Sequence, residues 1–515
     1  MTLRQTLHTL RTDTASALPA KQKSSLGQFF TPEGIAAFMA SLFETLEGEV
    51  RLLDPGCGVG SLFAAALAEG MRRGALKRME ITAFELDQGL ANPLQQAIEA
   101  CADLASDNGL SFEAEVQHAD FIVDGLGASL LSAPIGQAED FTHVIMNPPY
   151  KKIGTKSIHR QALRNLGVET VNLYTGFLAV AIQMLQPGGE LVAIVPRSFC
   201  NGTYYLPFRK FLLSQMAITH LHVFDKRNNA FDDVLQENII LHGIKGAQQG
   251  PVTITASAST DFRQDSQTGK PVVNDLITRT VAFEQVVKPQ DQHAFIHIVA
   301  REEAQRIVDQ ISRFTHTLDD LGLQVSTGPV VDFRLKSDLR QELEAGAVPL
   351  LYPQHLNGGI HWPKDGKKPN AIHVSRASLP WLWANDGHFV ITRRFSAKEE
   401  KRRVYASIYD ASLPGELIGF DNKLNVFHRQ KKGLSAALAK GLYVYLNSTL
   451  LDQYYRQFGG HTQVNATDLR NISYPSLASL QWLGSQFDGV SLTQEEVDHL
   501  LAQVERAISP APLLA

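Results

Sequence analysis

The chain contains 515 residues, of which 44% are hydrophobic and 20% are charged, values that are ordinary for a globular protein. The chain is longer than chains that fold around a single hydrophobic core usually are, so we predict two domains. The three cysteines lie far apart, without the spacing of metal ligands, so we expect neither a disulfide framework nor a zinc site. The polar N-terminus lacks the apolar core of a secretory signal, and no apolar run could span a membrane. These features favour a cytoplasmic protein without a membrane partner.

Charge is distributed unevenly along the chain. The net charge is -5, yet residues 321–475 hold 20 Lys and Arg against 13 Asp and Glu, a local balance of +7. The remaining residues therefore sum to -12. This asymmetry favours a basic module that meets a polyanion, joined to an acidic module with a different task.

From about residue 50 to residue 245, short apolar runs alternate with longer helical segments. The alternation predicts an α/β fold with a mostly parallel sheet and helices on both faces. The predicted strands are Val50–Leu53, Glu80–Phe84, Glu113–Gln117, His143–Met146, Glu190–Val195, Ile218–Phe224 and Asn238–Ile244. The predicted helices are Ser61–Arg73, Gln88–Asp107, Leu173–Leu185 and Pro207–Gln215. After the third of these helices, Gly188-Gly189 predicts a helix end before the next strand.

The composition changes after residue 245. Residues 246–275 are rich in Gly, Gln, Ser and Thr, and the chain after residue 320 mixes short β-like pieces with Trp, Tyr, Pro and paired basic residues. We therefore predict a first domain over 1–245, a connecting segment over 246–320 and a mixed α+β domain over 321–515.

A glycine-rich segment, Asp54-Pro-Gly-Cys-Gly-Val-Gly60, stands where the first strand turns into the first helix. Gly56, Gly58 and Gly60 allow a tight turn and the close approach of a bound group, and the helix start offers unpaired N–H donors. The spacing is GxGxG rather than the GxGxxG that suits a pyrophosphate. The carboxylate of Asp54 would repel phosphates but could pair with an ammonium group or accept from hydroxyls. The segment therefore favours adenosylmethionine over NAD.

Acidic residues also follow the next two predicted strands. Glu85 is placed to accept hydrogen bonds from both hydroxyls of a ribose. Asp120 could accept from an adenine amino group, and Phe121 could cover the adenine ring. A single acid at a strand end is most often a helix cap or a solvated charge. The ordered set at three successive strand ends instead predicts a nucleoside-bearing cofactor.

The tetrapeptide Asn147-Pro148-Pro149-Tyr150 follows the fourth predicted strand, 93 positions after Asp54. Ligands of open α/β sheets collect at this carboxyl edge. The amide oxygen of Asn147 and a carbonyl of the proline loop can accept both N–H bonds of a flat amino group. Those bonds draw the nitrogen towards tetrahedral geometry, which frees its lone pair for a methyl group, while Tyr150 would stack on the ring. The structural alternative is a Pro-Pro turn with Tyr150 as a surface aromatic.

Together these motifs resemble the amino-group DNA methyltransferases of type II restriction–modification systems, in which a target-recognition domain follows the cofactor and catalytic motifs. The likeness covers about residues 25–245, and weakly the segment from Leu446 to Pro475. It implies a Rossmann-like methyltransferase domain over 1–245, S-adenosyl-L-methionine as cofactor and a target-recognition domain over 321–515. It also implies double-stranded DNA as substrate and a separate restriction endonuclease acting on the same site. The tract 246–320 has no counterpart.

The resemblance also implies roles for individual residues. Phe30, Thr31 and Pro32 would cradle the methionine end of the cofactor, and Phe177 would line the adenosine pocket. By a looser match, Phe231 would place a second aromatic ring against an extruded base, opposite Tyr150.

The catalytic loop does not by itself identify the acceptor, because similar enzymes methylate RNA bases or protein glutamines. Those chains usually lack a long basic domain, whereas here Arg393-Arg394, Lys401–Arg403 and His428–Lys432 could neutralise phosphates and read base edges. An initial Asn resembles adenine-N6 enzymes, and an initial Ser is commoner among cytosine-N4 enzymes. We therefore expect transfer to N6 of a flipped adenine in duplex DNA. Four alternatives stay open: methylation of cytosine N4, methylation of RNA, methylation of protein glutamine, and a non-catalytic DNA-binding subunit.

Overall fold

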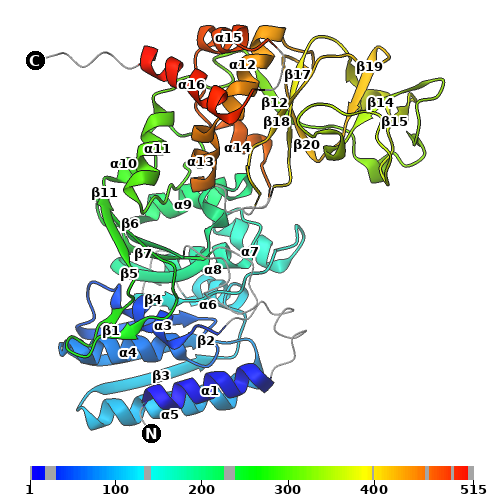
Figure 1. Cartoon of the computed structure of the whole chain (residues 1–515). Helices are drawn as coiled ribbons and strands as arrows, with labels where there is room; N and C mark the ends of the chain where they lie inside the picture. The colour runs from blue at the N-terminus through cyan, green and yellow to red at the C-terminus, as the bar shows by residue number, and fades with distance from the viewer. Residues whose placement is uncertain are drawn as a thin grey trace, which may run out of the picture. The chain divides into compact units, whose positions relative to one another are not determined.

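The computed structural model describes residues 3–17, 30–132, 141–224, 238–396, 400–458, 463–488 and 492–508 (Figure 1). The chain forms two compact units, Met1–Arg301 and Glu302–Ala515. Within the described ranges, no helix is both long enough and apolar enough to cross a membrane.

The first unit is built on a nine-stranded sheet with the order β11-β8-β6-β7-β5-β4-β1-β2-β3. Its strands are β1 (Gly48–Pro55), β2 (Leu76–Phe84), β3 (Ser111–Gln117), β4 (Phe141–Met146), β5 (Leu185–Pro196), β6 (Met216–Phe224), β7 (Asn238–Lys245), β8 (Val252–Ser257) and β11 (Ile277–Val281). Strands β3, β2, β1, β4 and β5 are parallel, whereas β7 runs antiparallel to β5 and β6. The predicted α/β fold is confirmed, and the ends of β1 to β5 share one edge.

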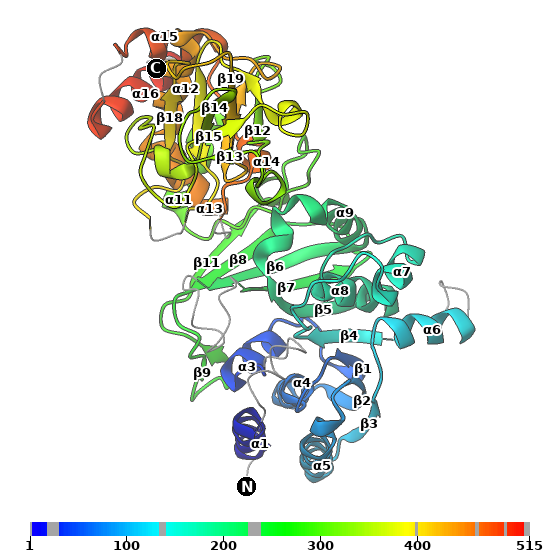
Figure 2. The same ribbon diagram turned by 90° about the vertical axis from the view of Figure 1, so that its right-hand side faces the viewer.

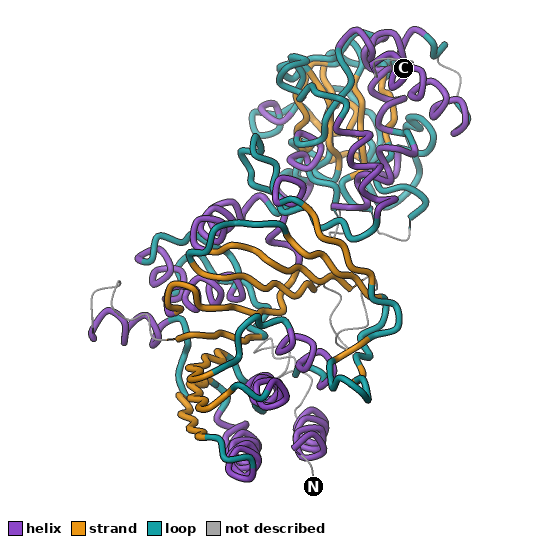
Figure 3. Tube along the Cα trace, turned by 90° about the vertical axis from the view of Figure 1, so that its left-hand side faces the viewer, coloured by secondary structure: helices purple, strands orange, loops and turns teal. Residues whose placement is uncertain are grey.

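Helices cover both faces of this sheet (Figures 2 and 3). One face packs on α3 (Glu33–Ser41), α4 (Ser61–Arg73) and α5 (Ala91–Asp107), and the other packs on α8 (Leu173–Met184) and α9 (Leu206–Gln215). Alternation along β5 explains the two cores, since Val192 and Ile194 face the first set of helices while Leu191 and Ala193 face the second. The remaining helices are α1 (Leu3–Ala17), which contacts α5, and α6 (Val123–Ser132), α7 (Ile158–Asn165) and α10 (Phe283–Val286).

The predicted elements correspond closely to those of the first unit, with one helix end misplaced. The predicted helix Ser61–Arg73 is α4 without any shift. The predicted stop at Gly188-Gly189 is wrong, because α8 ends at Met184 and both glycines lie within β5. Leu185 already pairs with Phe141 of β4, so sheet pairing ends the helix before the glycines are reached.

The boundaries of the two units differ from those expected at residues 245 and 320. Strand β8 pairs in parallel with β6, and β11 pairs with β8, so the sheet continues past residue 245. The polar tract 246–275 therefore contributes the internal strand β8, and the small hairpin β9 (Arg263–Gln264) and β10 (Pro271–Val272), to the first unit.

The second unit begins with one helix, continues with strands and ends with further helices. Its sheets have the orders β12-β20-β17-β18 and β13-β15-β14-β19-β16. The strands are β12 (Gln324–Thr327), β13 (Leu339–Arg340), β14 (Ala347–Leu351), β15 (Ala371–His373), β16 (Trp383–Ala384), β17 (Phe389–Arg393), β18 (Ala406–Tyr409), β19 (Leu417–Phe420) and β20 (Leu424–His428). The helices are α11 (Glu302–Ser312), α12 (Ala436–Leu446), α13 (Thr449–Phe458), α14 (Ala466–Arg470), α15 (Leu477–Ser485) and α16 (Gln494–Ile508). This unit is a mixed α+β domain.

Candidate active site

The glycine-rich loop lies between β1 and α4 and has the open backbone that its sequence predicts. Gly56, Gly58 and Gly60 all have positive φ, at 79°, 59° and 81°. A Cβ atom on Gly60 would lie 2.3 Å from the ring of Phe63, and one on Gly58 would lie 3.3 Å from the ring of Phe30. Side chains are therefore excluded here, which leaves the loop backbone open to a bound group at the start of α4.

Two carboxylates stand behind this loop. Glu85 accepts from the backbone N–H of Gly58 at 2.9 Å and from that of Asp87 at 2.8 Å. Asp54 is 0% exposed, and its Oδ2 accepts from the N–H of Phe63 at 3.3 Å. Burial raises the pKa of Asp54 well above its ordinary value, the Phe63 N–H offsets part of that rise, and the charge of Glu85 adds to it. Two neighbouring acids in a buried site favour a cationic ligand.

The loop that carries Asn147 follows β4. Both the nitrogen and the oxygen of the Asn147 side-chain amide have hydrogen-bond partners. Asn147 Nδ2 donates to Thr31 Oγ1 at 3.0 Å, and the Tyr150 hydroxyl lies 3.0 Å from Asn147 Oδ1 and 3.2 Å from the carbonyl oxygen of Ile194. Thr31 is only 4% exposed, and burial raises the pKa of Tyr150. These contacts orient the amide with its nitrogen towards Thr31 and its oxygen towards Tyr150. Pro32, next to Thr31, is the N-cap of α3.

The two loops meet at Gly56. A Cβ atom built on Gly56 would lie 3.6 Å from Phe177, 3.9 Å from the carbonyl oxygen of Asn147 and 4.0 Å from Pro149. Pro148 is buried beside them. Residues that lie far apart in sequence therefore form one site at the carboxyl edge of the sheet, with a planar amide next to a ligand-binding loop.

Asp120 and Phe121 follow β3 and are engaged within the protein. Asp120 Oδ1 accepts from the N–H groups of Ile122 and Val123, and its Oδ2 lies 2.7 Å from His159 Nε2. Phe121 is buried, with its ring centroid 5.1 Å from that of Phe177. Phe121 therefore supports Phe177 from the core.

Two curated proteins resemble this chain over nearly their whole length. The type II methyltransferase M.PstI of Providencia stuartii is 41% identical over 493 residues, which is 95% of this chain and 94% of the relative. The type II methyltransferase M.BsuBI of Bacillus subtilis is 42% identical over 496 residues, or 94% and 95% of the two chains. The chain belongs to the type II methyltransferases of restriction–modification systems.

A family model and solved structures agree with this membership. The model of the Eco57I restriction-modification methylase matches residues 77–231. The type IIL restriction-modification enzyme MmeI, solved in complex with DNA, superposes with a TM-score of 0.53 at 10% identity, over 93% of this chain and 73% of that one. The DrdV–DNA complex gives a TM-score of 0.51 at 14% identity, over 96% and 60%. At such identities the superpositions show a shared fold.

As a type II methyltransferase, the protein acts on DNA and takes S-adenosylmethionine as its cofactor. One feature of the site fits this cofactor: Asp54 Oδ1 is buried and has no hydrogen-bond partner among the described residues. An uncompensated buried carboxylate oxygen is costly without a ligand that carries donors or positive charge. The ammonium, sulfonium and hydroxyl groups of the cofactor provide both.

Two contacts of this site have no signal in the sequence. His159 contacts Asp120 from 39 positions away, and Thr31 contacts Asn147 from 116 positions away. Both contacts depend on tertiary structure rather than on spacing. Phe231 lies outside the described residues.

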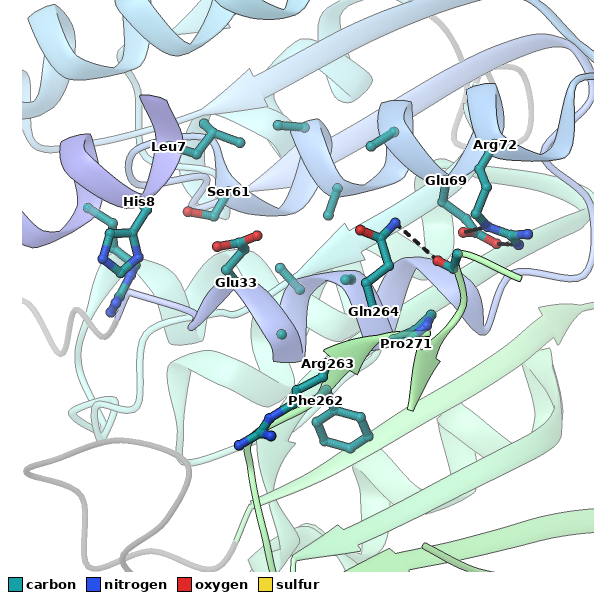
Figure 4. Close-up of a pocket in the computed structure, with 18 of the residues that line it drawn as sticks. Leu7, His8, Glu33, Ser61, Glu69, Arg72, Phe262, Arg263, Gln264 and Pro271 are labelled. Atoms are coloured by element: carbon teal, nitrogen blue, oxygen red, sulfur yellow. Dashed lines mark hydrogen bonds and ion pairs between the residues drawn. The ribbon is translucent and has the colours of Figure 1, made fainter. Parts of the chain in front are cut away.

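A separate cavity of about 310 Å³ lies along α4 (Figure 4). Its lining comes from α1, α3, α4 and the β9–β10 hairpin, and includes Leu7, Glu33 and Phe262. Neither Asn147 nor Glu85 lines it. This cavity is therefore distinct from the site at Gly56.

The basic clusters of the second unit divide into two kinds. Arg403 is buried, with its guanidinium 5.6 Å from the ring centre of Tyr455, and Arg402 donates to the carbonyl of Asn447. These arginines stabilise the fold. Lys401 and the turn Arg429–Lys432 are exposed, so only such residues can reach a phosphate without unfolding.

Proposed function

We propose that this methyltransferase transfers the methyl group to N6 of an adenine that is extruded from duplex DNA. The clamped amide of Asn147 is the observation that carries the proposal. Its nitrogen is held by Thr31, its oxygen points to the side of Tyr150, and its backbone borders Gly56 of the glycine loop. An amide fixed in this way is preorganised to accept hydrogen bonds from an amino group.

The chain's contribution to the reaction is to prepare the acceptor nitrogen. The two N–H groups of the acceptor nitrogen would donate to Asn147 Oδ1 and to the carbonyl of Pro148. In this structure the Tyr150 hydroxyl contacts Asn147 Oδ1. The nitrogen lone pair, released from the ring, is then free to accept the methyl group. When bound, S-adenosylmethionine would supply the methyl group from its sulfonium sulfur, which would keep the electron pair of the C–S bond. The alkylated nitrogen then loses one proton to solvent, so no strong base is needed.

Cofactor binding is proposed for the residues around the glycine loop. Phe30, Thr31 and Pro32 would hold the methionine end. Asp54, Gly56, Gly58 and Gly60 would form the floor, Glu85 would accept from the ribose hydroxyls, and Asp120, Phe121 and Phe177 would border the adenine. The close approach of Phe30 to Gly58 and of Phe177 to Gly56 supports this assignment.

The target base would lie between two aromatic rings. Tyr150 would be one, with its hydroxyl anchored as described, and Phe231 would be the other. Extrusion is required because an adenine paired inside a duplex does not present its amino group to the site. The second unit, broadly the predicted domain 321–515, would recognise the target sequence.

Mass spectrometry of nucleosides tests the proposal. The purified chain is incubated with S-adenosylmethionine and unmodified genomic DNA, which is then digested. N6-methyladenine is expected. N4-methylcytosine as the sole product would reassign the base, and transfer only to tRNA or protein would reassign the substrate. No transfer by the single chain, in the presence of measured cofactor binding, would favour the non-catalytic alternative.

A separate restriction endonuclease is proposed as the functional partner in the cytoplasm. The prediction is that DNA modified by this protein resists an endonuclease that cleaves the same site. Sequencing of the modified DNA first identifies the site. Cleavage of fully modified DNA by that endonuclease would contradict the protective role.

A further inference from the structure

Tyr204 is the most exposed large apolar side chain in the described part of the protein, with 77% of its surface accessible. It lies in the short 3₁₀ helix η3 (Thr203–Tyr205), which follows β5. Strands β4 and β5 are parallel neighbours, so the segments after them leave the same edge of the sheet. The turn that carries Tyr204 therefore leaves the same edge of the sheet as the segment that carries Asn147.

A buried arginine fixes the turn that presents Tyr204. Arg209 in α9 is 0% exposed, and its Nη1 donates to the carbonyl oxygens of Phe199 at 2.8 Å and Gly202 at 2.7 Å. Its Nε and Nη2 donate to the carbonyl oxygen of His293 at 3.0 and 2.8 Å. Burial lowers the pKa of Arg209 to about 10, which still leaves it charged at neutral pH. The support beneath Tyr204 is thus rigid.

Further contacts join this turn to the catalytic loop. The hydroxyl of Tyr205 accepts from Asn172 Nδ2, and Asn172 forms a β-bridge with Lys152. The ring of Tyr174 lies between those of Tyr205 and Tyr150, with centroid distances of 6.0 and 6.3 Å. The position of Tyr204 is therefore coupled to that of the loop in which the methyl acceptor would lie.

The segment to which this turn is joined carries positive charge. Lys151 and Lys152, which directly follow the catalytic tetrapeptide, are both exposed. Cations on that segment, together with an exposed aromatic ring on a turn that Arg209 holds, match the requirements of duplex DNA, whose phosphates pair with lysines and whose bases stack on aromatic rings.

We propose that Tyr204 is a DNA wedge: it stacks on the base pair next to the target and occupies the space that the target base leaves. This inference rests on the proposed function, because it requires that the target base be extruded. A ring held in that space stabilises the open duplex and so favours the extruded state. Tyr204 would act on the DNA but not on the cofactor.

The test compares Tyr204→Ala, Tyr204→Phe and Val272→Ala, the last an apolar side chain on β10 that is 43% exposed. Each variant methylates two duplexes that contain the site found by sequencing. In one duplex the target base is paired, and in the other it faces a mismatch, which removes much of the cost of extrusion. The readouts are kcat/KM for each duplex and the affinity for S-adenosylmethionine without DNA.

On the paired duplex, Tyr204→Ala is expected to lower kcat/KM about 5- to 150-fold, the range for loss of one stacked base. On the mismatched duplex the loss should be less than about threefold, because extrusion is already easy. Tyr204→Phe and Val272→Ala should leave both values unchanged, and cofactor affinity should stay constant.

An unchanged kcat/KM of Tyr204→Ala on the paired duplex overturns the wedge, as does an equal loss on both duplexes, which would indicate a general DNA contact. Neither result affects the proposed function, which the activity of the wild-type protein on the paired duplex tests separately.

Discussion

Replacement of Thr31 by Val removes the acceptor that orients the Asn147 amide while keeping the shape of the side chain. The lost hydrogen bond is 3.0 Å long and is buried on the side of Thr31. Leaving a buried donor without its partner costs about 1–3 kcal/mol. Because Asn147 is only half-buried, we expect the lower part of this range, about 1–2 kcal/mol, or a roughly 5- to 30-fold loss of rate.

The loss should be in kcat, because Thr31 acts through the amide that prepares the acceptor and not on the duplex. Single-turnover and steady-state rates with saturating DNA and S-adenosylmethionine measure it, and thermal unfolding checks that Thr31→Val is folded. Thr31→Ser, which keeps the hydroxyl, should recover most of the activity. A wild-type kcat in Thr31→Val, or an equally slow Thr31→Ser, would refute the role of this hydrogen bond.

Two further predictions concern buried acids. Asp54→Asn should raise the melting temperature of the cofactor-free protein at pH 7 and weaken S-adenosylmethionine binding. Burial raises the folded-state pKa of Asp54, so stability falls as pH rises above the unfolded pKa; a lower melting temperature without cofactor would contradict this. Glu190→Gln should cost about 3 kcal/mol of unfolding free energy in urea at pH 7. Burial alone would raise the pKa of Glu190, but hydrogen bonds from His143 and His242 outweigh it and lower the pKa. The stabilisation is therefore fully present above the unfolded pKa and is lost as pH falls from there through the lowered folded-state pKa, and a cost of the substitution that does not shrink over that interval would contradict it.

The parts of the site that were predictable from sequence are those set by local pattern. A strand followed by a sharp turn locates Asp54, Glu85 and Asn147, because the carboxyl ends of parallel strands must share one edge. The structure brings the loops after β1 and β4 together at Gly56, as that reasoning requires.

What could not be predicted depends on contacts between distant segments. The boundary at residue 245 was misplaced because Gln249 and its neighbours look like a polar linker. In the structure the Gln249 side chain accepts from the N–H of Ile218 and donates to its carbonyl, both at 2.8 Å, and so mimics a strand partner. Arg403 likewise looked like a phosphate ligand, yet it is buried against Tyr455. Composition alone does not distinguish these uses of a polar side chain.

The central claim is that methyl transfer takes place at the Asn147 amide, next to the glycine loop. Single-turnover methylation by Asn147→Ala, measured beside its affinities for S-adenosylmethionine and DNA, tests it most directly. We expect a rate at least about 100-fold below that of the wild type, as for loss of a preorganised polar group at a reacting centre, with both affinities nearly unchanged. A rate within a few-fold of the wild type would show that the acceptor is prepared elsewhere.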